Sequence, residues 1–388
     1  MVFDDLAPRP WAGATAGRRD GDDRCPGALR LHEAADGWLA RVRVPGGRVT
    51  AAQALALADA AAEFGSGLVD ITSRANLQLR GLTADAAGPL AGVLRAAGLL
   101  PSASHERVRN VLASPLAGRD PRALIDGSAL CAALDRAICA DPVLAGLSGR
   151  FQFGVEDGAG LLAGADVDVL LAAVGPDEVE LVVGGRRTDR RADVSAAAAL
   201  GTAEARAFLA RAGGAWRISS DRGANRGHMT PLAPGSCLEQ ADGRGATTAL
   251  VPLGRLDAAQ LRGLARLAPE LRVSPWRTVT LVDLPDARRA ADGLRALGLV
   301  LDAATGWHRL TACAGLGACP RARLDVRAAA RARGTRRRAT DPPEHWSACP
   351  RRCGLPAGEV RAVTWTEDGI DADGRIVPDL TAALEAVT

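Results

Sequence analysis

The alternation of hydrophobic and polar residues predicts a protein of mixed strands and helices. From Trp38 to Val44 apolar and charged residues alternate, which is typical of a half-buried strand. The Ala- and Leu-rich segment after Thr50 has helical spacing, with Thr50 as a suitable N-cap and Gly65 as a suitable stop. A second strand is predicted through residues 68–82 and a second helix over 84–98. The first part of the chain therefore forms a strand–helix–strand unit followed by a helix.

The same pattern recurs over residues 249–284. The segment GRLDAAQLRGLA from Gly254 matches GRVTAAQALALA from Gly47, and SPWRTVTL resembles TSRANLQL. A further helix, ARRAADGLRALG, again follows. The recurrence predicts two pseudo-symmetric βαβ halves that pack together. Chance similarity among Ala- and Leu-rich helices is the alternative, but the shared order of strand, Gly-Arg turn, helix and Arg-bearing strand argues against it.

The segment between the repeats has a different pattern. Helices are predicted over 121–139 and 197–212, and strands near 150–155 and 178–183. We expect five segments along the chain. They are an N-terminal arm (1–24), a first half (25–100), an α/β domain (101–240), a second half (241–303) and a C-terminal domain with four cysteines (304–388).

Composition limits the function classes. With 388 residues, 47% of them hydrophobic, the chain is long enough for globular domains with real cores. A net charge of +3 gives no indication of a nucleic-acid partner. The sequence contains no Lys, which excludes Schiff-base and lysine acid–base chemistry. It shows neither a secretory signal nor an apolar run long enough for a bilayer. We therefore expect a cytoplasmic protein without a membrane partner.

Four cysteines near the C-terminus are the strongest chemical signal. Cys313 and Cys319 form a C-x5-C pair, and Cys349 and Cys353 form a C-x3-C pair after an insert. Four convergent thiolates suit a [4Fe–4S] cluster. A structural zinc site and disulfides are the alternatives, although zinc motifs usually have tighter pairs. Of the other cysteines, Cys131 and Cys139 are predicted core thiols, whereas Cys25 and Cys237 receive no role.

Arginine and amide side chains recur at spacing two on predicted strands. Period-two alternation would place such residues on one face, as a salt-bridged surface or as a wall that binds a polycarboxylate. These candidate substrate-binding residues are Arg74, Asn76, Gln78, Arg80, Arg107, Arg109, Arg150 and Gln152. The insert between the cysteine pairs is also basic, as a solvated helix face or as a dock for an acidic electron donor or substrate carboxylates. Its arginines are Arg321, Arg323, Arg327, Arg331, Arg333, Arg336, Arg337 and Arg338.

These motifs together resemble the sirohaem-dependent nitrite and sulfite reductase superfamily. The resemblance rests on the cysteine pattern, a T-x-R-x-x-x-Q motif at Thr72, Arg74 and Gln78, the Arg109-Asn110 step and the internal duplication. It covers nearly the whole chain from Cys25. It implies an α+β fold, with duplicated ferredoxin-like βαβ halves paired into one domain and two α/β domains of the nitrite/sulfite reductase type. Within the superfamily, CPGALRLHEAADGWLARVRVPGGRVT and GLVDITSRANLQLRGL are most similar to the precorrin-3B synthase family.

The resemblance to that family implies an iron–sulfur monooxygenase of aerobic cobalamin biosynthesis. Such an enzyme uses dioxygen and reducing equivalents to convert precorrin-3A, a polycarboxylate tetrapyrrole, to precorrin-3B, by C20 hydroxylation with γ-lactone formation. The family implies a [4Fe–4S] cluster and a non-haem iron, and an electron donor such as an NADH-linked reductase or a ferredoxin. Candidate iron ligands are several Asp and His32, His105, His228, His308 and His345, none with two-His-one-carboxylate spacing.

Two other functions fit the same resemblance. A sulfite or nitrite reductase would bind sirohaem and use a Lys-x-Lys pair to deliver protons, but Arg150 and Gln152 stand at those places. Arginine, with a pKa above about 12, is a poor proton donor at neutral pH. The third possibility is a non-catalytic tetrapyrrole-binding or electron-transfer protein with the same fold. The missing lysines favour the monooxygenase over the reductase.

Overall fold

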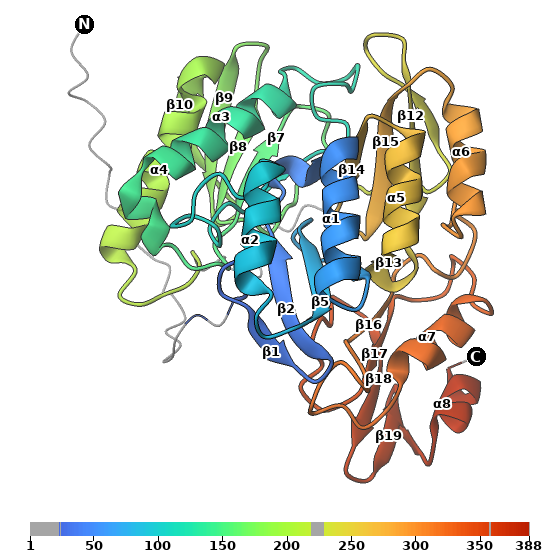
Figure 1. Cartoon of the computed structure of the whole chain (residues 1–388). Helices are drawn as coiled ribbons and strands as arrows, with labels where there is room; N and C mark the ends of the chain where they lie inside the picture. Colours follow the sequence, from blue (N-terminus) through green and yellow to red (C-terminus); the bar gives the residue numbers. More distant parts are fainter. Residues whose placement is uncertain (1–22, 24, 219–228, 357, 388) are drawn as a thin grey trace, which may run out of the picture. The chain divides into compact units, whose positions relative to one another are not determined.

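The computed structural model describes residues 23, 25–218, 229–356 and 358–387 (Figure 1). The chain forms two compact units. The central unit consists of Met1–Cys25 and Pro101–Thr230, and the split unit consists of Pro26–Leu100 and Pro231–Thr388. The arm predicted over residues 1–24 lies, apart from Asp23, outside the described residues.

The split unit contains two five-stranded sheets that exchange a strand. The first has the order β1 (His32–Ala34), β2 (Gly37–Val42), β5 (Leu77–Leu82), β4 (Leu68–Ile71) and β13 (Arg255–Asp257). The second has the order β11 (Cys237–Glu239), β12 (Gly245–Leu250), β15 (Thr278–Leu284), β14 (Glu270–Val273) and β3 (Arg48–Thr50). Strand β3 of the first half thus pairs with β14 of the second, and β13 pairs with β4. Each half completes the other's sheet.

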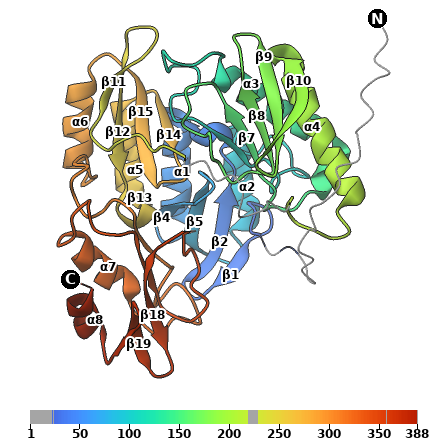
Figure 2. The same ribbon diagram turned by 180° about the vertical axis from the view of Figure 1, so that it is seen from behind.

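Matching helix starts explain why the two halves fold alike. Thr50 and Gln53 form a capping box at the start of α1 (Ala51–Phe64), and Asp257 and Gln260 form one at α5 (Ala258–Leu267). Helices α1 and α5 lie side by side (Figure 1). Helices α2 (Ala87–Ala96) and α6 (Ala287–Ala296) follow β5 and β15. Figure 2 shows α6 beside β11 and β12. Apolar residues of both halves form one core.

The strand predicted over residues 68–82 is wrong, because this segment is a hairpin of β4 and β5. The turn Thr72–Asn76 joins them, with Ala75 at φ 54°. The turn Ser274–Thr278 joins β14 and β15 in the same way, with Arg277 at φ 61°. In each turn the first residue's N–H donates to the last residue's carbonyl, at 2.9 and 3.1 Å respectively. The internal repeat therefore extends to the backbone of these turns.

The central unit contains one sheet with helices. The strand order is β10 (Arg186–Asp193), β9 (Glu178–Val183), β8 (Val169–Ala173), β7 (Phe153–Glu156) and β6 (Val111–Ala113). Strands β6, β7 and β8 are parallel, whereas β9 and β10 are antiparallel to their neighbours. The helices are α3 (Gly127–Ala140), α4 (Val194–Arg211) and the short η2 (Pro142–Gly146). Their apolar faces and the sheet share one core.

The C-terminal part of the split unit repeats this connectivity. Its sheet has the order β16 (Leu310–Ala312), β17 (Glu344–Ser347), β18 (Arg361–Thr366), β19 (Gly369–Ala372) and β20 (Arg375–Val377), with the first three parallel. Helix α7 (Val326–Gly334) follows β16 and α8 (Leu380–Ala386) follows β20, as α3 follows β6 and α4 follows β10. Asp126 N-caps α3 and Asp325 N-caps α7. The chain therefore contains two kinds of internal repeat.

The mixed α+β architecture agrees with the predicted fold class. Strand β2, helix α1 between Thr50 and Gly65, and β9 were predicted closely, whereas β8 and β10 were not predicted. No helix among the described residues is both long and apolar enough to cross a membrane. Two short connections, η1 (Pro45–Gly47) and η3 (Pro252–Gly254), precede β3 and β13.

Candidate functional site

The four predicted cluster ligands lie in the loops that follow two neighbouring parallel strands. Cys313 comes directly after β16, and Cys349 comes two residues after β17. Ala312 is paired with Trp346, and the N–H of Cys313 donates to the carbonyl of Trp346 at 2.9 Å. Because parallel strands end at the same edge of a sheet, both cysteine loops leave the sheet at one edge.

The surroundings of Cys313 are suited to a bound thiolate. Its Sγ accepts the N–H of Ala348 at 3.3 Å. Burial raises the pKa of Cys313, and the nearby Cys349 and Cys353 raise it further, while the N–H groups of Ala348 and Gly315 lower it. Three of the four thiols thus lie close enough to interact electrostatically. A positively charged iron centre would remove their mutual repulsion, so this donor set fits a cluster.

The described residues do not form a site for a single metal ion. Within the part of the chain that the structure describes, no group of three or more His, Cys, Asp or Glu side chains is arranged to hold a metal ion. The ligands of a [4Fe–4S] cluster bind different irons and lie farther apart than the ligands of one ion. The cluster at the four cysteines therefore stays a prediction.

The histidines considered for a non-haem iron differ in burial and in their contacts. His32 is exposed on β1, and His308 is half-buried. His105 is buried, with Nε2 2.9 Å from the carbonyl of Asp141. His228 lies outside the described residues. The ligands of a mononuclear iron remain unassigned.

His345 lies directly beneath the second cysteine loop. It is fully buried on β17, and its Nδ1 is 2.7 Å from Thr311 Oγ1. A Cβ atom at Gly354 would be 3.7 Å from its Cε1. Burial and the nearby Arg277 lower its pKa to about 4, whereas the backbone of Cys353 raises it. His345 is therefore neutral at pH 7 and packs against the loop that carries Cys353.

Arg80, predicted to bind substrate, contacts the first cysteine loop. It is 3% exposed, and its Nε and Nη2 both donate to the carboxylate of Asp36 at 2.9 Å. Nη2 also donates to the carbonyl of Ala318 at 3.1 Å, next to Cys319. The charge of Arg80 is paired within the fold. Its observed contacts position the loop that carries Cys319.

The other residues of this segment that were predicted to bind substrate have different surroundings. Arg74 and Asn76 lie in the turn before β5, so the period-two argument applies only to Gln78 and Arg80. The Oδ1 of Asn76 accepts the N–H of Val44 at 3.2 Å. The Oε1 of Gln78 accepts from Arg41 Nη2 at 2.9 Å. Arg74 is half-buried.

The remaining predicted residues, Arg107, Arg109, Arg150 and Gln152, belong to the central unit. Arg109 is buried, and Nε and Nη2 donate to the two carboxylate oxygens of Asp135 at 2.8 and 2.7 Å. Arg107 Nη1 donates to the carbonyl of Asp23 at 3.1 Å. The Arg150 guanidinium lies 4.5 Å from the centroid of the Trp216 ring. Gln152 is buried. Their role toward a ligand stays a prediction.

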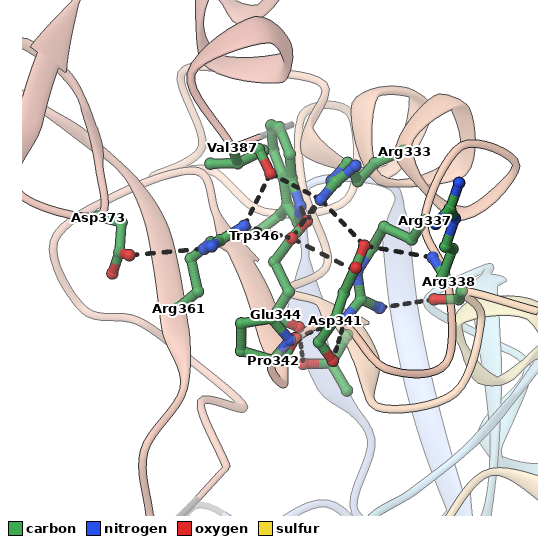
Figure 3. A network of polar contacts seen from close by, with 12 residues as sticks. Arg333, Arg337, Arg338, Asp341, Pro342, Glu344, Trp346, Arg361, Asp373 and Val387 are labelled. Atoms are coloured by element: carbon green, nitrogen blue, oxygen red, sulfur yellow. Dashed lines mark hydrogen bonds and ion pairs between the residues drawn. The ribbon is translucent and has the colours of Figure 1, made fainter.

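The basic insert is not a uniformly solvated helix face. Arg333 and Arg337 are buried around Glu344, which is 0% exposed (Figure 3). Glu344 lies 3.3 Å from Arg333 Nε and 3.5 Å from Arg337 Nε, and it accepts from Trp346 Nε1 at 2.7 Å. Arg333 therefore joins α7 to β17, and Arg337 joins the segment after α7 to the same strand. Five arginines of the insert are exposed and keep both predicted roles: Arg321, Arg323, Arg331, Arg336 and Arg338.

Sequence reasoning missed Arg255 and Arg277, which lie around Asp70 together with two arginines that it had singled out, Arg80 and Arg327. Arg255 donates to both carboxylate oxygens of Asp70, at 2.6 and 2.9 Å. Asp70 is also 3.8 Å from Arg80. Arg277 and Arg327 lie near these residues and interact with them electrostatically. The one signal in the sequence was Arg277, at the place in the second repeat that Ala75 occupies in the first.

Two segments of the chain match the model of a known family. The model of the nitrite/sulfite reductase ferredoxin-like half domain matches residues 32–97 and 238–291. These two segments contain most strands of the two sheets that exchange β3 and β13. Each half is therefore ferredoxin-like and similar to the half domain of nitrite and sulfite reductases.

Several known proteins are similar over part of the chain. A precorrin-3B synthase of Sinorhizobium sp is 35% identical over 164 residues, 42% of this chain and 34% of the relative. A ferredoxin–nitrite reductase of Synechococcus elongatus is 35% identical over 127 residues, 31% of this chain and 25% of the relative. The matches thus span about a third or less of these curated relatives. The solved NirA protein of Mycobacterium tuberculosis covers 81% of this chain and 68% of its own, with TM-score 0.63 and 22% identity, which shows a shared fold.

Proposed function

We propose that this chain is an oxidoreductase of the nitrite/sulfite reductase superfamily and converts precorrin-3A to precorrin-3B. The reaction would use dioxygen and reducing equivalents for C20 hydroxylation and γ-lactone formation. The similarity to a precorrin-3B synthase over 164 residues supports this reaction class. The proposed partners are the polycarboxylate tetrapyrrole and an electron donor, an NADH-linked reductase or a ferredoxin.

The observation that carries the proposal is the pair of cysteine loops at one edge of the β16–β17 pair. Cys313, Cys349 and Cys353 interact there, and backbone N–H groups point at the Cys313 sulfur. A [4Fe–4S] cluster, when bound by these residues and Cys319, supplies electrons for oxygen activation. N–H donors stabilise thiolate charge, and Arg80 holds the Ala318 carbonyl beside Cys319.

The absence of lysine favours this function over sulfite or nitrite reduction. Oxyanion reduction consumes several protons, and the chain has no lysine to deliver them. Arg150, which stands at the place of a lysine and lies in the turn before β7, packs its guanidinium 4.5 Å from the centroid of the Trp216 ring, and arginine is a poor proton donor. Hydroxylation of a bound tetrapyrrole needs its carboxylates to be neutralised and the ring to be oriented, which are tasks suited to arginine.

The test is turnover with precorrin-3A by anaerobically purified protein carrying its metal centres. On addition of reductant and dioxygen, we expect a product heavier by one oxygen atom, with label from isotopic dioxygen. The optical and EPR spectra should show an iron–sulfur cluster without sirohaem bands. Sirohaem bands together with sulfite or nitrite reduction would overturn the proposal. A cluster-bearing protein that binds the tetrapyrrole without forming the lactone would indicate a non-catalytic role.

Cysteine variants test the proposed ligands separately. Cys349→Ser should abolish the cluster absorbance and the turnover. Cys237→Ser is the matched control, because Cys237 is an exposed cysteine on β11 outside the ligand set. An unchanged spectrum and iron content in Cys349→Ser would remove that residue from the site.

A further inference from the structure

One face of the C-terminal sheet carries three buried polar atoms that lack a hydrogen-bond partner. They are His345 Nε2, Ser347 Oγ and Thr364 Oγ1, and no described residue supplies a donor or an acceptor for them. The three residues are at most 1% exposed. Buried polar groups in native proteins almost always have a partner, so three such atoms in one sheet need an explanation.

The three side chains lie on the same side of the sheet. His345 and Ser347 are two residues apart on β17, so both point to one face. Thr364 on β18 is the Cα partner of Ser347, and neighbouring strands are about 4.8 Å apart. The intervening residues Trp346 and Val363 belong to the apolar core that the sheet shares with α7 and α8. The polar face is therefore the one turned away from these helices.

The second cysteine loop, residues 349–354, lies against this polar face. It packs on the ring of His345. Arg352 of the same loop has its Nη2 3.4 Å from Oδ2 of Asp371, which is the Cα partner of Thr364 on β19. The loop therefore contacts the face at β17 and at β19, on both sides of Thr364.

His345 shows how the loop and the face are separated. Thr311 Oγ1 lies 2.7 Å from Nδ1, so in either tautomer Nε2 needs a different partner. Burial lowers the pKa of His345, whereas the backbone of Cys353 raises it, which is the effect of a carbonyl oxygen near the ring. Nε2 nevertheless makes no direct hydrogen bond within the described part of the chain. A water molecule between Nε2 and this carbonyl would pair with both groups.

The chemistry of the three atoms selects water over other ligands. A metal ion is not indicated, because no three His, Cys, Asp or Glu side chains among the described residues are arranged to hold one. An apolar ligand would leave all three atoms unsatisfied. Water donates and accepts, so it can pair with the hydroxyls of Ser347 and Thr364 and with either tautomer of His345.

We propose that this polar face is a binding site for ordered water that joins β17 and β18 to the second cysteine loop. One water molecule bridges Ser347 and Thr364, whose strands are close enough for it to contact both hydroxyls. Another bridges His345 Nε2 and the carbonyl of Cys353. The three side chains are then positioning residues for the loop, and this role does not depend on the reaction that the protein catalyses.

A crystal structure of the full chain, at a resolution that shows ordered solvent, tests the site directly. We expect water within about 3.2 Å of Ser347 Oγ and Thr364 Oγ1, and water between His345 Nε2 and the Cys353 carbonyl. Empty density at these places would overturn the proposal. So would density for an ion, or direct hydrogen bonds from these side chains to the protein or to a cluster sulfide.

Thr364→Val tests whether the hydroxyl is hydrated in solution, because it keeps the shape of the side chain. With water bound, the variant loses hydrogen bonds, and its thermal midpoint should fall by about 2–4 °C. Without a partner for the hydroxyl, its removal should raise the midpoint, which would overturn the site. Thr381→Val is the control, because Thr381 is exposed on α8.

His345 variants test the link to the second cysteine loop without turnover. In His345→Leu, amide hydrogen exchange at residues 353–355 should become about tenfold faster, because the loop loses its water-mediated contact. His345→Gln keeps a donor and an acceptor and should restore most of the protection. His32→Leu, at an exposed position of β1, is the control. Unchanged exchange in His345→Leu, or equal losses in the Leu and Gln variants, would overturn the positioning role.

Discussion

The guanidinium of Arg80 joins the carboxylate of Asp36 to the carbonyl of Ala318, which lies 238 residues after Arg80 in the chain. The first cysteine loop is thereby tied to strand β5 of the first half. Since Ala318 precedes Cys319, the ion pair and the candidate cluster site depend on each other. Arg80 is therefore a positioning residue in the split unit.

Arg80→Gln should disturb both the ion pair with Asp36 and the candidate cluster site. Losing one partner of this nearly buried pair leaves Asp36 without its cation, and we expect the free energy of unfolding to fall by about 3 kcal/mol. The iron content after reconstitution should fall as well, because the Ala318 carbonyl loses its donor. Urea unfolding and iron analysis check these outcomes. Arg95→Gln, on the exposed face of α2, should change neither, and full iron loading in Arg80→Gln would contradict the positioning role.

Glu344 is the centre of the ion-pair network shown in Figure 3. Glu344→Gln would remove the buried carboxylate between Arg333 and Arg337, leaving Arg333 only the partly exposed Asp341, and should destabilise the split unit by about 3–5 kcal/mol. Denaturant unfolding measures the change. Glu385→Gln, at an exposed position of α8, serves as the control. A loss of less than about 1 kcal/mol would mean that the network is not a coupled unit.

A buried carboxyl in the central unit makes stability depend on pH. Asp157 is 1% exposed, and its Oδ2 has no hydrogen-bond partner among the described residues. Burial raises its pKa to about 6, and the neighbouring Glu156 and Asp120 contribute. Below about pH 4 the carboxyl is protonated in both folded and unfolded chains. As the pH rises toward 6 the unfolded chain loses the proton first, so folding stability falls.

Asp157→Asn should remove this dependence. Burial of the Asp157 carboxyl lowers the free energy of unfolding at pH 7 by on the order of 2–3 kcal/mol. The variant should therefore be more stable than wild type at pH 7, and this difference in stability should be smaller near pH 4.5. The amide can still accept from the N–H of Ala159 through Oδ1. Chemical unfolding followed between pH 4.5 and 7.5 gives the two slopes. Asp189→Asn, at an exposed position, is the control, and a stability difference that does not vary with pH would rule out Asp157 as the source.

Gly47 allows the exchanged strand β3 to reach its partner. A Cβ atom there would be 2.0 Å from the carbonyl oxygen of Val273, and its φ is 67°. Gly98 has a similar φ of 70° with nothing within 4 Å, so it isolates the conformational effect. Gly98→Ala should cost about 1 kcal/mol, and Gly47→Ala at least about 2 kcal/mol more. Equal losses in thermal or urea unfolding would show that the close contact is unimportant.

Local patterns predicted much of the split unit. The N-cap at Thr50, the stop at Gly65 and the alternation of β2 each depend on residues close together in sequence. The repeat was visible because the second capping box, at Asp257, follows an equivalent Gly-Arg turn. The cysteine spacing likewise suggested one site, and both pairs do leave neighbouring strands.

The ion-pair partners could not be predicted in the same way. Arg80 and Arg109 were assigned to substrate from strand periodicity, but the carboxylates that hold them, Asp36 and Asp135, come from elements that periodicity does not connect to them. An arginine-rich sequence shows how many cations the chain has, but it does not show which carboxylates pair with them. Arg277 received no role from the sequence for the same reason.

The reciprocal pairing of β3 with β14 and of β13 with β4 has a consequence during synthesis on the ribosome. Arg48 and its partner Glu270 are 222 residues apart. The first half therefore lacks the strands of the second half while the central unit is being translated. At about 5–20 residues per second this delay is on the order of 10–40 s. During that interval the nascent chain presents an open edge at β4, and a chaperone bound there would guard the polypeptide against misassociation.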